Sequence, residues 1–224
     1  MRALLHIIRR AALLAAMSAL VPMAATPLQA QPLALEAGRD FVRIEPALVT
    51  DSGAERIEVL DVFWYGCPVC REFAPMMSYW GGEIRGDLVM RRMPAIWNEV
   101  MRLHARIHFT GVALQLEAQV HEAAFRYIHE QQQALNTEAQ ARKLFTTLGV
   151  TDAAFTEAWN SPEVETALQR AERDTQAAGI DRLPALVVNG RYRVVRNQSL
   201  RELPDLVVAT NELIKRERDL RRAD

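Results

Sequence analysis

The sequence feature that most constrains the fold is a buried-strand pattern that leads directly into two cysteines. Residues 57–65 (IEVLDVFWY) are almost continuously hydrophobic and are rich in β-branched and aromatic side chains. A strand buried on both faces of a sheet has this composition. A glycine follows, and residues 67–80 then place apolar side chains at helical spacing, with Pro68 suited to the first helical turn. We therefore predict a central strand that turns sharply into a helix beginning at Cys67.

Cys67 and Cys70 are the two cysteines of the chain, and only two residues separate them. A disulfide stabilises a protein mainly by restricting the unfolded chain, and this effect grows with the length of the loop that it closes. A bridge across Pro68 and Val69 would restrict very little. The spacing therefore favours redox chemistry over structural stabilisation.

Two alternatives for the cysteine pair are a structural bridge and a zinc site. The pair could supply half of a zinc site, and His104 and His108, one helical turn apart, would have to supply the other half. No second cysteine pair accompanies them, so we expect no metal ion and no other cofactor. A c-type haem would need a histidine directly after Cys70, where the sequence has Arg71.

The predicted helix makes the two thiols chemically unequal. Unpaired backbone N–H groups and the helix dipole, worth about 0.3–2 kcal/mol, favour a thiolate at Cys67. Cys70 lies nearly one turn further in and is expected to be buried and protonated. We predict that Cys67 is the nucleophile and that Cys70 resolves the mixed disulfide. Pro68 and Val69 are expected to tune the redox potential, because Val69 lies beside the developing charge.

Asp61 is a charged residue inside the apolar strand, six positions before Cys67. Burial disfavours the charged form of a carboxyl group and raises its pKa. A buried carboxyl at this place would relay a proton to or from Cys70. The alternatives are that Asp61 faces water or pairs with a nearby arginine.

Residues 1–30 have the layout of a cleavable secretory signal. Basic residues such as Arg2 and Arg9 precede an apolar run over residues 11–25, and small residues lead to Ala30. The apolar run is shorter than the roughly 20 residues that span a bilayer, so a cleaved signal is favoured over an uncleaved anchor. We expect an exported, soluble mature protein.

The order of elements after the cysteines predicts an α/β fold. Residues 87–94 have strand character, helical periodicity follows over residues 98–179, and strand character returns at residues 185–188. Asn189-Gly190 then predicts a hairpin, and residues 203–214 form an amphipathic helix.

This order resembles a thioredoxin fold with an inserted α-helical domain. We expect the thioredoxin-like domain to comprise residues 31–97 and 180–224. The inserted helical domain would comprise residues 98–179.

Three separated stretches together resemble the DsbA family of periplasmic thiol:disulfide oxidoreductases. They are VLDVFWYGCPVCREF (59–73), AFTEAWNSPEV (154–164) and GIDRLPALVVNGRY (179–192). The resemblance implies a periplasmic enzyme that donates its Cys67–Cys70 disulfide through a mixed disulfide. Its clients would be unfolded or newly exported proteins that contain cysteines, and a DsbB-like membrane protein would reoxidise it.

The same resemblance assigns further residues. Leu183-Pro184 matches the family's cis-proline loop, which lies beside the cysteines and pairs with the substrate backbone, and Asp61 occupies the place of the buried acid. Val69 departs from the histidine of the well-studied oxidases. We therefore expect a less acidic Cys67 and a less oxidising disulfide than in histidine-bearing relatives.

Two other functions are left open by the sequence: a periplasmic disulfide reductase, and a chaperone-like module that binds exported clients without turnover. Nucleic-acid binding is not expected, because 27 basic and 28 acidic residues leave no positive excess to neutralise phosphates. A monomer is favoured. The mature stretch before Cys67 is too short for the dimerisation domain that similar isomerases carry.

Overall fold

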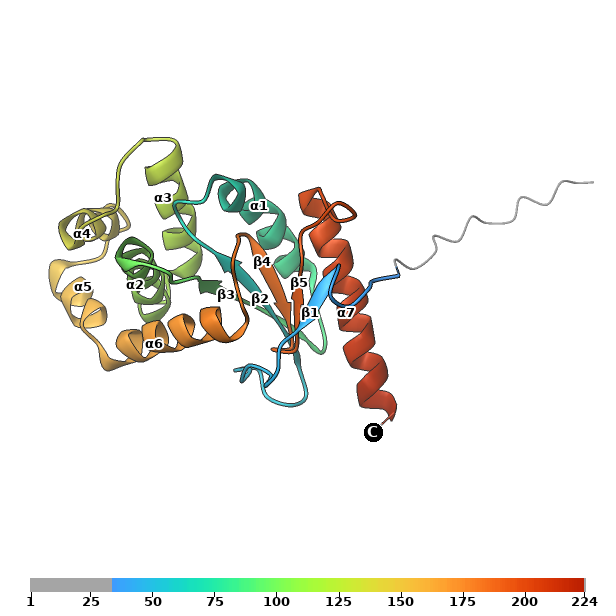
Figure 1. The fold of residues 1–224 in the computed structure, drawn as a ribbon. Coiled ribbons are helices and arrows are strands. Elements are labelled where there is room, and N and C mark those ends of the chain that lie inside the picture. Colours follow the sequence, from blue (N-terminus) through green and yellow to red (C-terminus); the bar gives the residue numbers. More distant parts are fainter. Residues whose placement is uncertain (1–33, 224) are drawn as a thin grey trace, which may run out of the picture. The chain divides into compact units, whose positions relative to one another are not determined.

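The computed structural model describes residues 34–223, and the predicted signal sequence over residues 1–30 lies outside this range. The described residues form a five-stranded sheet and seven helices (Figure 1). The strands are β1 (Phe41–Arg43), β2 (Ile57–Phe63), β3 (Leu88–Pro94), β4 (Ala185–Val188) and β5 (Tyr192–Val194). The helices are α1 (Pro68–Glu83), α2 (Glu99–Ala113), α3 (Glu117–His129), α4 (Glu138–Thr147), α5 (Asp152–Trp159), α6 (Pro162–Ala177) and α7 (Leu203–Ala223).

The sheet has the strand order β1-β5-β4-β2-β3. β2 is parallel to β3 and antiparallel to β4, and all seven of its residues are buried. This confirms the sequence prediction of a buried central strand. The strand ends at Phe63 rather than at residue 65, because Trp64, Tyr65 and Gly66 form the turn that leads to α1.

Helices cover both faces of the sheet, and the alternation of side chains along β2 divides the core between them. Ile57 and Val59 pack in one cluster with Phe73 of α1 and Leu213 of α7. Leu60 and Val62 point to the opposite face, where they share a cluster with residues of α2 and α6. A residue at an odd position of β2, such as Asp61, therefore faces the side of the sheet that carries α1.

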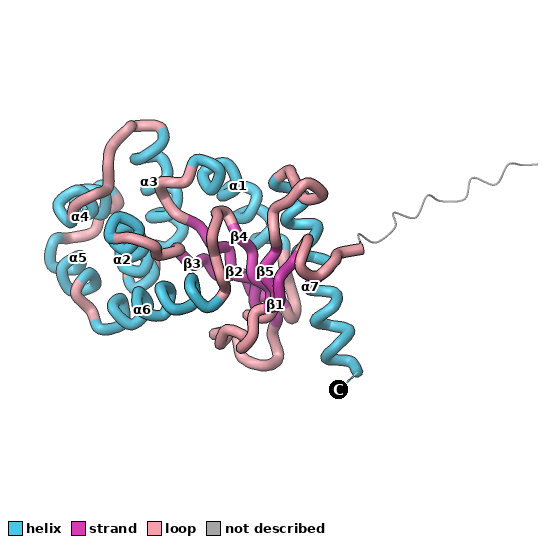
Figure 2. Tube along the Cα trace, viewed as in Figure 1, coloured by secondary structure: helices cyan, strands magenta, loops and turns pink. Residues whose placement is uncertain are grey.

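Five consecutive helices, α2 to α6, lie between β3 and β4 in the chain, as the helical periodicity predicted. Figure 2 shows them gathered beyond the β3 side of the sheet, away from α7. Side-chain caps define the starts of α2, α4, α5 and α6, and they include the capping box of Thr137 and Gln140 and the cap at Ser161. The α/β fold with an inserted helical segment is therefore as the sequence predicted. Within residues 34–223, no helix has the length and hydrophobicity that crossing a membrane requires.

Candidate active site

Cys67 is the N-cap residue of α1, at the point where the chain leaves the turn after β2. Its backbone is extended, with φ −86° and ψ 115°, so its side chain is turned back over the first helical turn. The Sγ atom accepts a hydrogen bond from the backbone N–H of Cys70 at 3.1 Å. Pro68 follows in the first turn, where its missing N–H leaves no helical hydrogen bond unmade. Cys67 therefore lies at the helix N-terminus, where the sequence placed it.

The two thiols have different environments. Cys67 keeps 9% of its surface exposed, whereas Cys70 keeps 2%. The pKa of Cys67 is lowered to about 7, mainly by a hydrogen bond from the Cys70 side chain and then by the backbone N–H groups of Cys70 and Val69. Burial raises the pKa of Cys70. The thiolate of this pair therefore belongs at Cys67, the more accessible sulfur.

The cause of this difference departs in one respect from the sequence reasoning. The helix amides were expected to supply most of the stabilisation of the Cys67 thiolate. The largest single contribution to its lowered pKa is the hydrogen bond from the protonated Cys70 side chain, and the backbone N–H groups of Cys70 and Val69 lower the pKa further. Cys70 thus stabilises the Cys67 thiolate as well as lying next to it.

Leu183 and Pro184 lie at the same end of the sheet as the cysteines. Pro184 directly precedes β4, where Ala185 pairs with Val62 near the end of β2. The peptide bond between Leu183 and Pro184 is cis. Leu183 is half-buried and, like Val69, packs against the apolar cluster that contains both cysteines. Segments more than 100 residues apart in the sequence therefore meet around the sulfur atoms.

Asp61 is buried on β2, with 3% of its surface exposed, so it does not face water. Burial raises the pKa of Asp61 to about 6, against the attraction of the Arg92 charge, which lowers it. Arg92 is its register partner on β3. The charge of Asp61 also raises the pKa of Cys70, so the carboxyl and the buried thiol interact electrostatically.

Arg92 is a residue of this site that the sequence analysis did not single out. Its guanidinium donates to Ser78 Oγ on α1 at 2.9 Å and to a carboxylate oxygen of Glu117 on α3 at 3.3 Å. Arg92 therefore links β3, the strand that pairs with β2 at Asp61, to α1 and α3. Only the register of β2 and β3 brings Arg92 to Asp61, and nothing local in the sequence specifies that register.

The end of α3 holds the turn and helix that carry the cysteines. His129 Nε2 lies 2.7 Å from the carbonyl oxygen of Tyr65, two residues before Cys67. The next residue, Glu130, forms an ion pair with Arg71, directly after Cys70. The helical segment is thus attached on both sides of the cysteine pair.

The histidines considered for a zinc site lie in an aromatic cluster. His104 and His108 are both buried on α2, and His108 Nδ1 is 3.4 Å from the hydroxyl of Tyr65. Burial lowers the pKa of His104 to about 4 and that of His108 to about 3. Across residues 34–223, no group of three or more histidine, cysteine, aspartate or glutamate residues could hold a metal ion.

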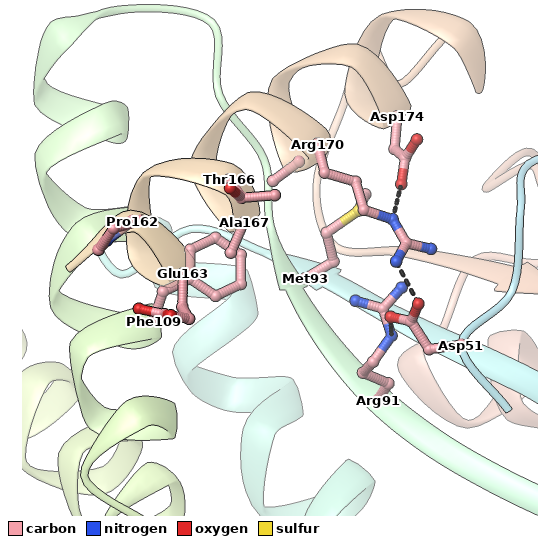
Figure 3. Close-up of a pocket in the computed structure, with 11 residues that line it drawn as sticks. Asp51, Arg91, Met93, Phe109, Pro162, Glu163, Thr166, Ala167, Arg170 and Asp174 are labelled. Carbon is pink, nitrogen blue, oxygen red and sulfur yellow. Dashed lines mark hydrogen bonds and ion pairs between the residues drawn. The ribbon is translucent and has the colours of Figure 1, made fainter. Parts of the chain in front are cut away.

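A separate cavity of about 410 Å³ lies between α6, α2 and β3 (Figure 3). Its apolar wall includes Met93 and Phe109. Its charged edge is an ion-pair network in which Arg170 contacts Asp51 and Asp174. The cavity contains none of the residues predicted for the site, and Asp51 and Asp174 contact its arginines. It adds nothing to the chemistry of the cysteine pair.

Comparison with known proteins identifies relatives over most of the described chain. The family model of DSBA-like thioredoxin domains matches residues 83–208, a range that begins after the cysteine pair. The thiol:disulfide interchange protein DsbA of Azotobacter vinelandii is 33% identical over 162 residues, which cover 72% of this chain and 75% of that protein.

Solved structures show the same likeness. The crystal structure of Pseudomonas aeruginosa DsbA has a TM-score of 0.78 at 26% identity and covers 84% of this chain and 97% of that one. The oxidoreductase DsbA from Xylella fastidiosa has a TM-score of 0.76 at 28% identity and covers 83% of this chain and 98% of that one.

Proposed function

Because this chain belongs to the family of DSBA-like thioredoxin domains and is a thiol:disulfide oxidoreductase, we propose that Cys67 and Cys70 form its redox-active disulfide. The observation that carries this proposal is the Cys67 sulfur at the N-terminus of α1, where it accepts the N–H of Cys70. A thiolate held there is a good leaving group, which makes the disulfide easy to transfer.

The exchange proceeds in two steps that move two electrons from the client to the cysteine pair. The two client thiols lose two protons, of which Cys70 takes up one, and the other goes to solvent while Cys67 stays ionised. A client thiolate attacks Cys67 Sγ, the Cys67–Cys70 bond breaks, and Cys70 leaves as a thiolate that takes up a proton. A second client thiolate then attacks the client sulfur of the mixed disulfide, and Cys67 leaves. The client gains a disulfide, and the enzyme holds two reduced cysteines.

Asp61 relays the proton that Cys70 takes up or releases. A pKa of about 6 lets this carboxyl exchange a proton near neutral pH. Its electrostatic effect on the Cys70 thiol supports the assignment. Arg92 is a positioning residue in this scheme, because its charge limits how far the pKa of Asp61 rises.

Leu183 and Pro184 bind the client backbone beside the nucleophile. Their place at the start of β4, next to the end of β2, supports this role. Pro68 and Val69 tune the redox potential, since the N–H of Val69 acts on the Cys67 sulfur. Residues 98–179 form an inserted domain within a thioredoxin-like domain of residues 31–97 and 180–224.

The enzyme acts in the periplasm as a monomer, after removal of a signal peptide over residues 1–30. Its clients are newly exported proteins with reduced cysteines, and a DsbB-like membrane protein reoxidises it. The relatives' name, thiol:disulfide interchange protein, supports clients of this kind.

The proposal is tested with a reduced, unfolded client that needs disulfides to become active. The oxidised protein should restore client activity in stoichiometric amounts, and Cys67→Ser should abolish this. Cys70→Ser, first converted to its glutathione mixed disulfide at Cys67 with oxidised glutathione, should exchange glutathione for a client that has a single cysteine and accumulate a Cys67–client disulfide that mass spectrometry detects. If Cys67→Ser protects clients from aggregation as well as the wild type does and neither protein oxidises them, the chaperone-like function is correct instead.

A disulfide reductase is the second candidate, and the weak acidity of Cys67 favours it. Redox-active cysteines of this kind have pKa values from about 3.5 to 7.5, and a value of about 7 lies at the weakly acidic end. A less stable thiolate makes the disulfide harder to reduce and the dithiol a better reductant. The equilibrium constant with glutathione separates the two directions, because a strongly reducing value would assign the enzyme to reduction.

A further inference from the structure

A hollow between the end of β1, the start of β5 and α7 has a basic lining. It encloses about 620 Å³, a volume within the range of sites that hold organic ligands. We refer to it as the β1–α7 hollow, and the side chains that line it include Arg43, Glu45, Ala47, Arg191, Arg216 and Leu220. The glutamate forms an ion pair with none of the three arginines, so the lining carries a surplus of positive charge.

The hollow lies at the end of the sheet opposite to the cysteines. Ala185, the first residue of β4, pairs with Val62 at the cysteine end of β2. Val188, the last residue of β4, pairs with Tyr192, which directly follows Arg191. The length of β4 therefore separates the hollow from the sulfur atoms, and the disulfide exchange does not use it.

The three guanidinium groups of the hollow have no acceptor in the part of the chain that the structure describes. Arg43, Arg191 and Arg216 form neither an ion pair nor a side-chain hydrogen bond there, and all three are exposed to solvent. A neighbour on α7 behaves differently, because Arg218 donates to both carboxylate oxygens of Asp87. Each free guanidinium has five N–H donors, so the hollow presents donors and charge that a dissolved ligand can reach.

Two of these guanidinium groups are restrained by aromatic rings. The Cζ atom of Arg43 lies 5.9 Å from the centre of the Tyr192 ring, and that of Arg216 lies 5.1 Å from the centre of the Phe41 ring. The two rings are buried and meet edge to face, with their centres 5.5 Å apart. Cation–π contacts of this kind limit the side-chain entropy that is lost when a ligand binds. They also hold like charges on neighbouring rings, and an anion would relieve the repulsion.

The charge of the hollow favours a doubly charged oxyanion over a single carboxylate. Three arginines against one glutamate leave two positive charges in surplus. A phosphate monoester carries about −1.5 to −2 charges at pH 7 and presents three oxygen acceptors. Guanidinium groups bind phosphate oxygens in pairs. Ala47 and the 43% exposed Leu220 add an apolar side against which an organic group can pack.

We propose that the β1–α7 hollow binds a phosphate monoester. The phosphoryl oxygens accept hydrogen bonds from Arg43, Arg191 and Arg216, and the organic part of the ligand packs on Leu220. The site is separate from the cysteine pair and goes beyond the proposed function. Its phosphoryl group comes either from a soluble phosphorylated compound or from a phospholipid headgroup such as that of phosphatidic acid, and the test distinguishes these sources.

The test measures binding to the mature protein by isothermal titration calorimetry at constant ionic strength. The probes are phenyl phosphate, which is doubly charged at about pH 7.5, and benzenesulfonate, which has the same ring and a single charge. Sedimentation with phosphatidylcholine vesicles, with and without phosphatidic acid, examines the lipid source. The readout is binding alone, so neither a positive nor a negative result bears on the redox chemistry.

We expect phenyl phosphate to bind with a dissociation constant below about 1 mM, and benzenesulfonate to bind at least about tenfold more weakly. Arg43→Gln and Arg216→Gln should each weaken phenyl phosphate binding by about tenfold or more, because each removes a charged donor. The matched control is Arg173→Gln. It removes the same charge from an exposed arginine of α6 outside the hollow, and it should leave the affinity unchanged.

Binding of phenyl phosphate without binding of the vesicles identifies a soluble ligand. Vesicle binding that needs phosphatidic acid and is lost in Arg43→Gln identifies the lipid headgroup. If neither phenyl phosphate nor the vesicles bind, the inference is wrong. Equal affinities for phenyl phosphate and benzenesulfonate would also overturn it, as would an equal loss of affinity in Arg173→Gln, which would reveal a general effect of protein charge.

Discussion

The backbone N–H of Cys70 donates a hydrogen bond to the sulfur of Cys67 at 3.1 Å, so one cysteine is part of the environment that ionises the other. The side chain of Cys70 adds a second donor to the same sulfur. Reduction of the pair therefore creates the hydrogen bonds that stabilise its product. The pair acts as one unit, and substitutions at position 70 should change the acidity of position 67.

Cys70→Ala is expected to raise the pKa of Cys67 from about 7 toward the ordinary value of a thiol. The substitution removes the side-chain donor, which contributes about 1.5–3 kcal/mol when its acceptor is charged. Cys70→Ser is the matched control, because its hydroxyl still donates. The pH dependence of iodoacetamide modification measures the pKa in all three proteins. An equal pKa in the alanine and serine variants would show that the helix amides act alone.

Val69→His is expected to lower the pKa of Cys67 and to make the disulfide more oxidising. An imidazole at this half-buried position would donate to the thiolate and stabilise the reduced form. We expect the equilibrium constant with glutathione to change by at least about tenfold, or about 30 mV. Val69→Thr controls for the loss of the apolar side chain. If the redox potential of the disulfide is unchanged in Val69→His, the residue at position 69 does not tune it.

Asp61→Asn is expected to stabilise the reduced protein, and more strongly at pH 7 than at pH 5. The folded state raises the pKa of Asp61 from 3.8 to about 6, so it binds the proton more tightly than the unfolded state. The contribution of the Asp61 carboxyl to the free energy of unfolding is present below about pH 4 and is lost as the pH rises toward about 6. The gain should be about 3 kcal/mol at pH 7 and about half of that at pH 5.

Urea unfolding at the two pH values measures this gain, and the rate of peptide oxidation measures the relay. The variant should oxidise peptides more slowly, because Cys70 loses its proton partner. An equal change in stability at both pH values would show that Asp61 is not titrating in this range. A normal oxidation rate would remove Asp61 from the mechanism.

The buried histidines are expected to destabilise the protein in mild acid. Burial lowers the pKa of His108 from 6.5 to about 3, so the unfolded state gains a proton that the folded state excludes. Stability is full above about pH 6.5 and decreases as the pH falls toward about 3. His108 alone should remove about 2 kcal/mol between pH 7 and pH 5.

His108→Phe should reduce the difference in unfolding free energy between pH 7 and pH 5 by that amount. The variant and the wild type are compared by the difference in unfolding free energy between pH 7 and pH 5. A change in packing energy that is the same at both pH values cancels in this difference. If the difference between the pH values matches that of the wild type, His108 is not the group that titrates.

The local parts of this fold could be predicted from the sequence, and the parts set by long-range pairing could not. β2 and the start of α1 were predictable because hydrophobicity, Pro68 and the cysteines all act within a few residues. The caps at Thr137 and Ser161 were predictable for the same reason. Leu183 and Pro184 were placed by resemblance, since no local pattern brings a loop more than 100 residues away to a given sulfur.

Other parts of the site depend on contacts that the sequence does not encode locally. Arg92 reaches Asp61 through the register of two parallel strands. His129 contacts the carbonyl of Tyr65 across 64 positions, and a lone histidine near the end of a helix gives no sign of such a contact. The acid at position 61 was recognisable because a charge within an apolar strand is costly wherever the strand lies.

The attachment of α3 to both sides of the cysteine pair has a consequence for exchanging parts between relatives. His129 holds the residue two positions before Cys67, and Glu130 holds the residue directly after Cys70. A chimera that takes α2 to α6 from a chain without these two side chains would lose both contacts at once and leave the turn unsupported. Transplanting the segment would therefore alter the chemistry of sulfur atoms that are not part of the transplant.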